Sequence, residues 1–511
     1  MLLEVIGILV VLWLVYKVAN IKYDHWRYSH LPGPPRESFF LGNAPEFRRR
    51  LLADGSWGPF WLDMVREHGI IFRFWMVMKP IVFVADPLSL KEMVSDFKTY
   101  PKIRDGKGFI ARRWVTLDLQ KMYTQRFCGH NSLLTTVDMD IWRRKKRIMD
   151  PAFSKSGLAR HLTEFYNIGI DLCDNIEAKQ EETPGEPIDV TSIVGPASID
   201  AISRAGFSAT DDEMERLRDQ GGDDAFDLTT QLMSKAGSVL AMVLDSKTRK
   251  IFVKYADGIK RIRKLGAQMI MERTSGEKHG RVGDILDYII SANTDDNSGR
   301  FDMEEGLDDF MTMYAAGNAT TSTTLLWCLG QLTRNPGVMD KLVDEIDEVW
   351  GAAGVDRYSN PKLIEETHKD MPYLGAFLKE VLRHHSPITR IHRTALKTVN
   401  LCGFRIPAMT SLMGSQHVMH LWDKFWDDPE KFEPDRFLTS TPKPYTYVPF
   451  FLGPRACTGK DFAILELKCF LCELLSRFTV ELDPNAPPKQ RSAQVLICVP
   501  IDNSFIFKPR L

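Results

Sequence analysis

One cysteine near the C-terminus lies in a setting that suits a metal-bound thiolate. Cys457 follows Phe450, Gly453 and Arg455 and precedes Gly459, and an apolar segment with helical periodicity begins directly afterwards. Glycine lets a backbone come close to a sulfur and a planar cofactor, and the positive end of a helix favours an anionic sulfur. A buried structural cysteine is the competing interpretation. The combined pattern instead predicts that Cys457 is the axial ligand of a haem iron, with Arg455 close enough to pair with a haem propionate.

The spacing FxxGxRxCxG is similar to the ligand-loop signature of the cytochrome P-450 superfamily, and every fixed position of that signature is present. Two further segments also resemble family motifs. Glu380 and Arg383 match the ExxR motif, and Arg436 lies in a Pro-Asp-Arg-Phe segment like the one that supplies a second arginine. The resemblance implies that these three residues form a buried structural ion network. Removing one member of such a network costs about 3–5 kcal/mol.

Two more segments are similar to family elements that contact the haem. Trp142 and Lys146 have the spacing of the WxxxR-like helix, with lysine in place of the commoner arginine, and Arg393 resembles a strand arginine. The resemblance implies propionate contacts for all three, although a solvated basic helix and a surface strand are the alternatives. The remaining cations of 143–147, with Lys460 and Lys468, suggest a basic face on which an acidic electron-transfer flavoprotein docks.

A helix predicted over 306–332 carries the oxygen-side motif of the family, with one departure. Gly317, Asn318 and Thr320 match the pattern AGx(D/E)T(T/S), but Ala319 occupies the acidic position. The glycine is expected to let the helix open, and the threonine hydroxyl to hold O₂ or a water. In the family an acid and an alcohol relay protons here, and alanine carries none. Either Asn318 and ordered water replace the relay, or the enzyme is poorly coupled, or its chemistry needs no protonation.

The resemblance implies the cytochrome P-450 fold, which is mainly α with a small β-rich lobe. Short β-like pieces occur at 70–74, 81–85 and 399–406, and helical periodicity dominates elsewhere. A formal net charge of -1 argues against nucleic-acid binding. Eight scattered cysteines lack the dense spacing of a disulfide framework, so the catalytic body is expected to face the cytosol.

The N-terminal segment is predicted to be a membrane anchor. Val5–Tyr16 is an uninterrupted apolar run, shorter than the roughly 20 residues of an ideal span, but Glu4 and Lys17 at its ends can snorkel. A buried core helix is the alternative. The basic residues that follow place the catalytic body on the cytoplasmic side. We expect a transmembrane signal-anchor at 1–20, a basic proline-rich hinge at 21–36 and a haem-thiolate catalytic domain at 37–511, held at the endoplasmic reticulum membrane as a single-pass protein.

Several segments look like the cholesterol 24-hydroxylase branch of the superfamily, most clearly after Gly306. That similarity implies a sterol or another long apolar substrate, although 217–240, which roofs the pocket in the family, is less similar. The expected function is monooxygenation with heme b, O₂ and electrons from NADPH through a flavoprotein reductase. Two alternatives stay open: a haem-thiolate isomerase or peroxygenase that acts on oxygenated lipids without reductase, and a non-catalytic haem-dependent lipid or gas binder.

Overall fold

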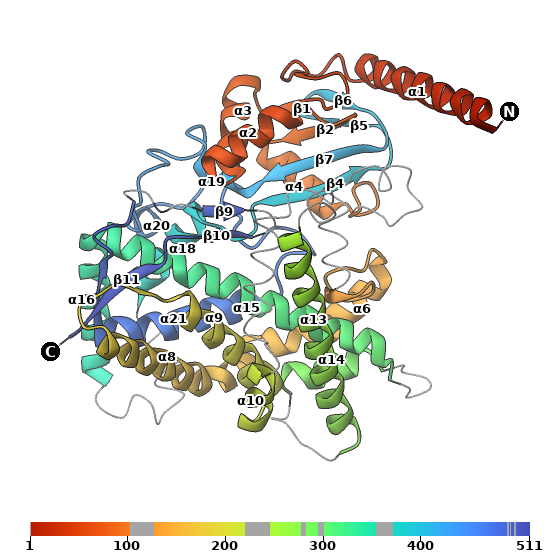
Figure 1. Cartoon of the computed structure of the whole chain (residues 1–511). Helices are drawn as coiled ribbons and strands as arrows, with labels where there is room; N and C mark the ends of the chain where they lie inside the picture. The colour runs from red at the N-terminus through yellow and green to blue at the C-terminus, as the bar shows by residue number, and fades with distance from the viewer. Residues whose placement is uncertain are drawn as a thin grey trace. The chain divides into compact units, whose positions relative to one another are not determined.

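The computed structural model of this chain describes residues 2–102, 127–219, 246–276, 283–294, 301–353, 371–487, 490, 492–494 and 497–510. The chain divides into two compact units. The first, here called the sheet unit, comprises residues 1–104, 389–429 and 443–456, and the second, the helical unit, comprises the remainder. Figure 1 shows the larger sheet in the first unit and most of the long helices in the second.

The sheet unit is built around four strands in the order β1-β2-β7-β4. β2 and β7 are parallel, whereas the other two pairs are antiparallel. A separate hairpin of β5 and β6 turns at Cys402 and Gly403, both of which have positive φ. The elements of this unit are α1 (Leu2–Arg27), α2 (Ala44–Asp54), α3 (Gly58–His68), β1 (Ile71–Met76), β2 (Lys79–Val84), α4 (Pro87–Ser95), β4 (Arg390–Ala395), β5 (Val399–Leu401), β6 (Phe404–Ile406), β7 (Thr410–Ser415) and α19 (Gln416–Leu421).

Alternation along the strands gives this sheet two apolar faces. Phe72 and Phe83 belong to one hydrophobic cluster, whereas their neighbours Ile71 and Val82 belong to another. Successive side chains of a strand point to opposite faces, so a run of apolar residues buries both sides. The strands predicted at 70–74, 81–85 and 399–406 are therefore confirmed.

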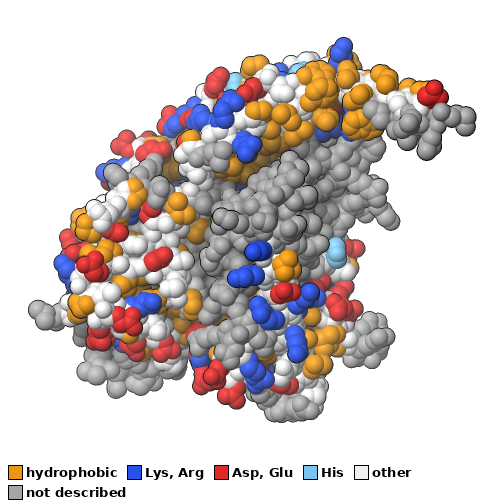
Figure 2. All heavy atoms as spheres, viewed as in Figure 1, with side chains coloured by type: hydrophobic (Ala, Val, Ile, Leu, Met, Phe, Trp, Pro, Cys, Tyr) orange, Lys and Arg blue, Asp and Glu red, His pale blue; other side chains and the backbone are white. Residues whose placement is uncertain are grey.

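α1 continues seven residues past the predicted end of the anchor at Asn20. Most of its apolar side chains between Val5 and Tyr16 are exposed, and Figure 2 shows hydrophobic side chains gathered along this helix. Within the described part of the chain, no helix combines the length and the apolar character that crossing a membrane requires.

The helical unit contains most of the helices and two small sheets, in the orders β3-β11-β8 and β10-β9. Its elements are α6 (Met139–Met149), η2 (Asp150–Phe153), α7 (Lys155–Leu158), η3 (Ala159–His161), α8 (Leu162–Glu182), β3 (Ile188–Asp189), α9 (Thr191–Asp200), η4 (Ala201–Gly206), α10 (Asp211–Asp219), α13 (Ser246–Thr274), α14 (Ile285–Ala292), α15 (Met303–Arg334), α16 (Pro336–Ala353), α18 (Pro372–His384), α20 (Arg436–Thr439), α21 (Lys460–Arg477), β8 (Phe478–Leu482), β9 (Ser492–Gln494), β10 (Cys498–Pro500) and β11 (Ser504–Pro509).

α15 is the central element of this unit. It packs against α9, α13, α14, α16, α18 and α21, and its residues 306–314 and 321–330 are buried. The helices predicted at 306–332 and after Gly459 are confirmed as α15 and α21. The segment 217–240, whose similarity to the family is weak, lies largely outside the described residues.

Candidate functional site

Cys457 differs from the other cysteines in its exposure. All eight cysteines lie within the described residues; six are buried and Cys402 is half-buried, whereas Cys457 is exposed. It lies three residues before α21, whose N-cap is Gly459. Although Cys457 is exposed as a residue, the protein around its sulfur desolvates the thiol and raises its pKa, and the Gly459 N–H and the Lys146 ammonium act in the opposite direction. A metal ion would deprotonate such a thiol.

The ligand loop begins in the sheet unit. Phe450, Gly453 and Arg455 belong to that unit, whereas Cys457 and Gly459 belong to the helical unit. Gly453 has a φ of +73°, and a Cβ there would lie 2.6 Å from the Val94 carbonyl oxygen, so glycine is required on both counts. At Gly459 a Cβ would meet only an ordinary contact at 3.8 Å. Steric need thus explains the first glycine of the motif and not the second.

Several cations lie close together in the sheet unit. Arg393 comes from β4, and Arg455 and Lys102 come from loops. Burial, followed by repulsion from Arg455 and Arg393, lowers the pKa of Lys102 to about 7. Burial and repulsion from Arg393 likewise lower the pKa of Arg455 to about 10. Buried like charges are costly unless an anion joins them, so this group suits a carboxylated ligand.

Two further basic residues lie on β4, and the sequence motifs did not identify them. Arg390 is stacked on the Trp57 ring with its guanidinium carbon 3.3 Å from the ring centroid. Burial, and then the charges of Arg390 and Arg393, lower the pKa of His392 to about 3, so that ring is neutral. The Nε atom of Arg393 is buried and has no hydrogen-bond partner among the described residues. The signal for them was the close spacing of Arg390, His392 and Arg393 in the sequence.

In the helical unit, α6 carries Trp142 and Lys146. Trp142 is buried in the main hydrophobic cluster. The Lys146 ammonium donates to the Thr458 hydroxyl at 3.1 Å and also pairs with Asp150. The structure therefore brings Lys146 to the residue that follows Cys457, which agrees with a lysine at the edge of the predicted cofactor.

Lys145, which precedes Lys146 on α6, has another role. We predicted that the remaining cations of 143–147 belong to a basic face, but Lys145 has no exposed side-chain area. Its ammonium donates to Asp309 at 2.9 Å and to the Asn131 carbonyl oxygen at 2.8 Å. Asp309 also accepts from the Leu133 N–H at 2.6 Å. The prediction is wrong for Lys145 because this side chain joins α6 to α15 in the protein interior.

Glu380, Arg383 and Arg436 form an ion network. The two Glu380 oxygens accept from Arg383 at 2.8 Å each, and one of them also accepts from Arg436 at 3.1 Å. The Glu433 N–H adds a fourth bond at 2.8 Å. Burial alone would raise the pKa of Glu380, but the bonds from Arg383 and His384 outweigh burial and lower it to about 2. The carboxyl is therefore ionised, as a structural network requires.

The oxygen-side motif forms an accessible strip on α15. Between the two buried stretches of this helix, Ala316 is exposed and Ala319 and Thr320 are half-buried. The Thr320 hydroxyl donates to the Ala316 carbonyl oxygen at 2.8 Å, which leaves its lone pairs free to accept. Ala319 offers no proton beside it. The strip can thus contact a ligand, and Thr320 is its polar group.

Gly317 and Asn318 lie elsewhere on the same helix. α15 is α-helical throughout, and a Cβ on Gly317 would lie 3.0 Å from Ile202, so this glycine admits a neighbouring side chain and opens no gap in the helix. The expected opening is corrected accordingly. Asn318 is two residues from both Ala316 and Thr320, about 200° around the helix, and its side chain is buried.

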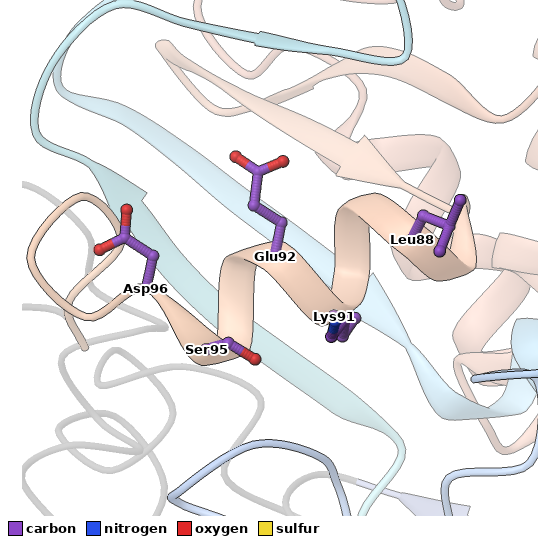
Figure 3. A pocket seen from close by; sticks show the side chains of 5 residues that line it. All are labelled: Leu88, Lys91, Glu92, Ser95 and Asp96. Atoms are coloured by element: carbon purple, nitrogen blue, oxygen red, sulfur yellow. The ribbon is translucent and has the colours of Figure 1, made fainter.

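The residues present fit a haem. The observation that supports this is a lone exposed thiol at a helix start, in the same unit as an exposed strip on the central helix. A hollow in the sheet unit does not compete with it. Its lining residues, Leu88, Lys91, Glu92, Ser95 and Asp96, all belong to α4 or its C-cap, and their side chains leave the helix on different sides (Figure 3). It brings together no set of catalytic groups.

Known proteins resemble this chain over nearly its whole length. The family model described as "Cytochrome P450" matches residues 32–507. Cytochrome P450 3A11 of Mus musculus is 24% identical over 486 residues, covering 92% of this chain and 89% of that protein. Lithocholate 6-beta-hydroxylase of Mesocricetus auratus is 25% identical over 530 residues, covering 97% and 96%. 7-deoxyloganic acid hydroxylase of Catharanthus roseus is 26% identical over 467 residues, covering 87% and 82%.

Proposed function

This chain belongs to the cytochrome P450 family, whose members are monooxygenases, and we propose that it hydroxylates an apolar lipid, namely a sterol or steroid. The relatives support this class of reaction, since two of them are named as hydroxylases of lithocholate and of 7-deoxyloganic acid. They do not single out a cholesterol 24-hydroxylase, so the similarity of 31–43 and 442–447 to that branch supports a sterol only in general terms.

The observation that carries the proposal is the exposure of Cys457 at the start of α21. In the proposed holoenzyme Cys457 binds the iron of heme b. Trp142 and Lys146 from α6, with Arg393 and Arg455 from the sheet unit, hold the propionates. Phe450, Gly453 and Gly459 shape the loop around the sulfur. When bound, the haem supplies the activation of O₂ and the oxidising power of the reaction, and the cysteinate promotes O–O cleavage.

The protein's own share of the chemistry is positioning and proton supply. Thr320 presents its oxygen as an acceptor, because its own proton is held by the Ala316 carbonyl. A water that donates to Thr320 is thereby oriented along the exposed strip of α15. Asn318, as a buried amide, would act only through further water and not by direct contact with a ligand at the strip.

One observation favours a second reaction. Ala319 removes the acid that would pass a proton beside Thr320. An isomerase or peroxygenase that rearranges an already oxygenated lipid needs neither that proton nor a reductase, so this chemistry remains the alternative.

Surface charge and the exposed apolar side chains of α1 support proposals on electron supply and location. We propose that an NADPH-dependent flavoprotein reductase docks on the exposed cations Arg143, Arg147 and Lys460, together with the half-buried Arg144 and Lys468. We propose further that residues 1–20 attach the protein to the endoplasmic reticulum membrane ahead of a hinge at 21–36 and the catalytic domain at 37–511. The exposed apolar side chains of α1 support this, with the catalytic domain on the cytoplasmic side.

A screen of substrates by the spin-state shift of the haem tests the proposal. Sterols and steroids should shift the Soret band at micromolar concentration, and turnover of a shifting compound should need both reductase and O₂. A protein that shifts with no sterol or steroid would contradict the substrate class. Turnover of a lipid hydroperoxide without reductase would instead favour the alternative.

A further inference from the structure

A buried carboxyl on α21 has no role in the site described above. Glu466 is 1% exposed, and its Oε1 atom has no hydrogen-bond partner among the described residues. The polar group that faces it is the Ser198 hydroxyl of α9. Ser198 is fully buried, and its oxygen also lacks a hydrogen-bond partner in the described part of the chain. Two buried polar groups therefore lie close together, and Oε1 of Glu466 and the Ser198 oxygen retain hydrogen-bonding capacity.

Glu466 differs from three other buried carboxyls of its unit that pair with a cation. Asp309 pairs with Lys145, Asp284 with Arg273, and Glu380 with Arg383. Ser198 is the polar group that lowers the pKa of Glu466, and burial outweighs it and raises that pKa well above its ordinary value. Burial without a cation partner favours the neutral carboxyl, which has an O–H to donate.

Glu466 and Ser198 lie toward the oxygen-side turn of α15. The segment from α9 into η4 runs antiparallel to α15, because Phe207 contacts Phe310 with ring centroids 4.5 Å apart and Ile202 covers Gly317. Ser198 is four residues before Ile202. The antiparallel register therefore places it about one helical turn beyond Gly317, beside the turn 320–324, and α21 packs against both α15 and α8.

That turn of α15 is polar although it is mostly buried. The hydroxyls of Thr320, Ser322 and Thr324 each donate to the carbonyl oxygen four residues earlier, so their lone pairs are left to accept. The Thr323 hydroxyl is fully buried and has no hydrogen-bond partner among the described residues. An interior that contains this many open acceptors is the kind that holds ordered water, since a buried water makes two to four such bonds.

We propose that Ser198 and Glu466 hold a buried water against residues 320–324 of α15, and that the carboxyl of Glu466 orients it. The inference rests on the proposed monooxygenase function, because it assigns a place to the water that has to serve beside Ala319. Glu466 is then a positioning residue, since it reaches the oxygen side only through water.

Infrared spectroscopy of the whole purified protein tests the water site without any turnover. The wild type should show the carbonyl stretch of a neutral carboxylic acid at pH 7, and Glu466→Gln should lose it, whereas Glu181→Gln at an exposed position of α8 should not. On transfer to D₂O the band should shift within minutes, because an acid in contact with exchangeable water takes up deuterium. Absence of the band, or a band that does not shift until the protein unfolds, would overturn the proposal.

Coupling then tests the link to function. Glu466→Gln can still donate a hydrogen bond and should retain most of the product formed per reductant consumed. Glu466→Met cannot hold the water and should lower that ratio. If Glu466→Met folds, shows the wild-type spectrum of the reduced carbon monoxide complex and keeps the wild-type ratio, the positioning role is excluded. If the wild-type protein lacked the thiolate spectrum, the proposed function would be contradicted. The infrared result on the water site would not be affected.

Discussion

Single residues with the same chemistry have different roles here because their exposure differs. Cys457 and Cys469 are both thiols on or next to α21, but only Cys457 is exposed. Lys145 and Lys146 are adjacent, yet the first reaches Asp309 in the interior and the second reaches Thr458 beside the ligand cysteine. Exposure therefore separates the groups that can meet a cofactor from those that hold the fold.

The substitution most informative about the reaction is at Ala319. General acid–base assistance is worth roughly 10²–10⁴-fold, so a missing acid should appear as reductant lost to peroxide. Ala319→Glu and Ala319→Asp should raise the product formed per reductant consumed, and Thr320→Ala should lower it. NADPH consumption, product and peroxide measured together provide the test.

Thr333→Ala is the matched control. Thr333 bonds back to the Leu329 carbonyl on the same helix, as Thr320 does to Ala316, but lies outside the exposed strip. It should leave coupling unchanged. If wild type is already tightly coupled and both acidic variants lose product, the proton arrives by another path or the chemistry is that of the isomerase.

At the scale of elements, buried ion pairs join helices that are distant in sequence. Glu380 and Arg436 connect α18 to α20, and Lys145 and Asp309 connect α6 to α15. Neither pair is expected to add much net stability, but breaking one strands a charge.

Glu380→Gln should weaken the dependence of the free energy of unfolding on pH in the acidic range. The fall in pKa from 4.5 to about 2 corresponds to about 3 kcal/mol at neutral pH, at 1.36 kcal/mol per pH unit. Because the folded-state pKa is depressed, this contribution is present above pH ~4.5 and is lost as the pH falls toward ~2. The variant should therefore be several kcal/mol less stable than wild type at pH 7, and the difference should shrink on acidification in urea unfolding. Glu433→Gln, which is at the surface near Arg436, should cost less than about 1 kcal/mol, and an equal loss there would refute the assignment.

We expect substitutions at Lys145 and Asp309 to have strongly non-additive effects on the free energy of unfolding. Lys145→Met alone strands the carboxylate and should cost about 3–5 kcal/mol. In the double variant Lys145→Met/Asp309→Asn, the amide oxygen still accepts from the Leu133 N–H, but the amide NH2 faces the Asn293 donor, so only part of the loss should be recovered. The exposed pair Asp140–Arg143 serves as control and should couple by less than about 1 kcal/mol. Additive losses at Lys145 and Asp309 in urea unfolding would exclude the buried pair.

Elements and motifs could be predicted from the sequence, whereas the burial of particular charged residues was predicted less well. Strand alternation and helix periodicity located β1, β2, α15 and α21, because apolar side chains must face a core. Lys145 was missed because it lies in a run of cations. Its spacing was nevertheless informative, since Trp142, Lys145 and Met149 share the buried face of α6. The cations around Arg393 come from segments far apart in the chain, and no local pattern relates them.

At the scale of the whole molecule, attachment and chemistry reside in different segments. α1 exposes its apolar side chains and contributes none of the residues assigned to the cofactor. Deleting residues 1–20 should leave haem incorporation largely intact and weaken retention on membranes. Haem content by absorbance and partition after sedimentation with microsomes measure both, and a truncated protein unable to bind haem would contradict this division.

The central claim is that Cys457 binds the iron of a haem as a thiolate. Carbon monoxide added to the reduced full-length protein measures this most directly, because a thiolate opposite the gas shifts the Soret band to the red. The wild type should show the shifted band, Cys457→His should bind haem without it, and Cys402→Ser should behave as wild type. An unshifted band in intact wild-type protein would contradict the account.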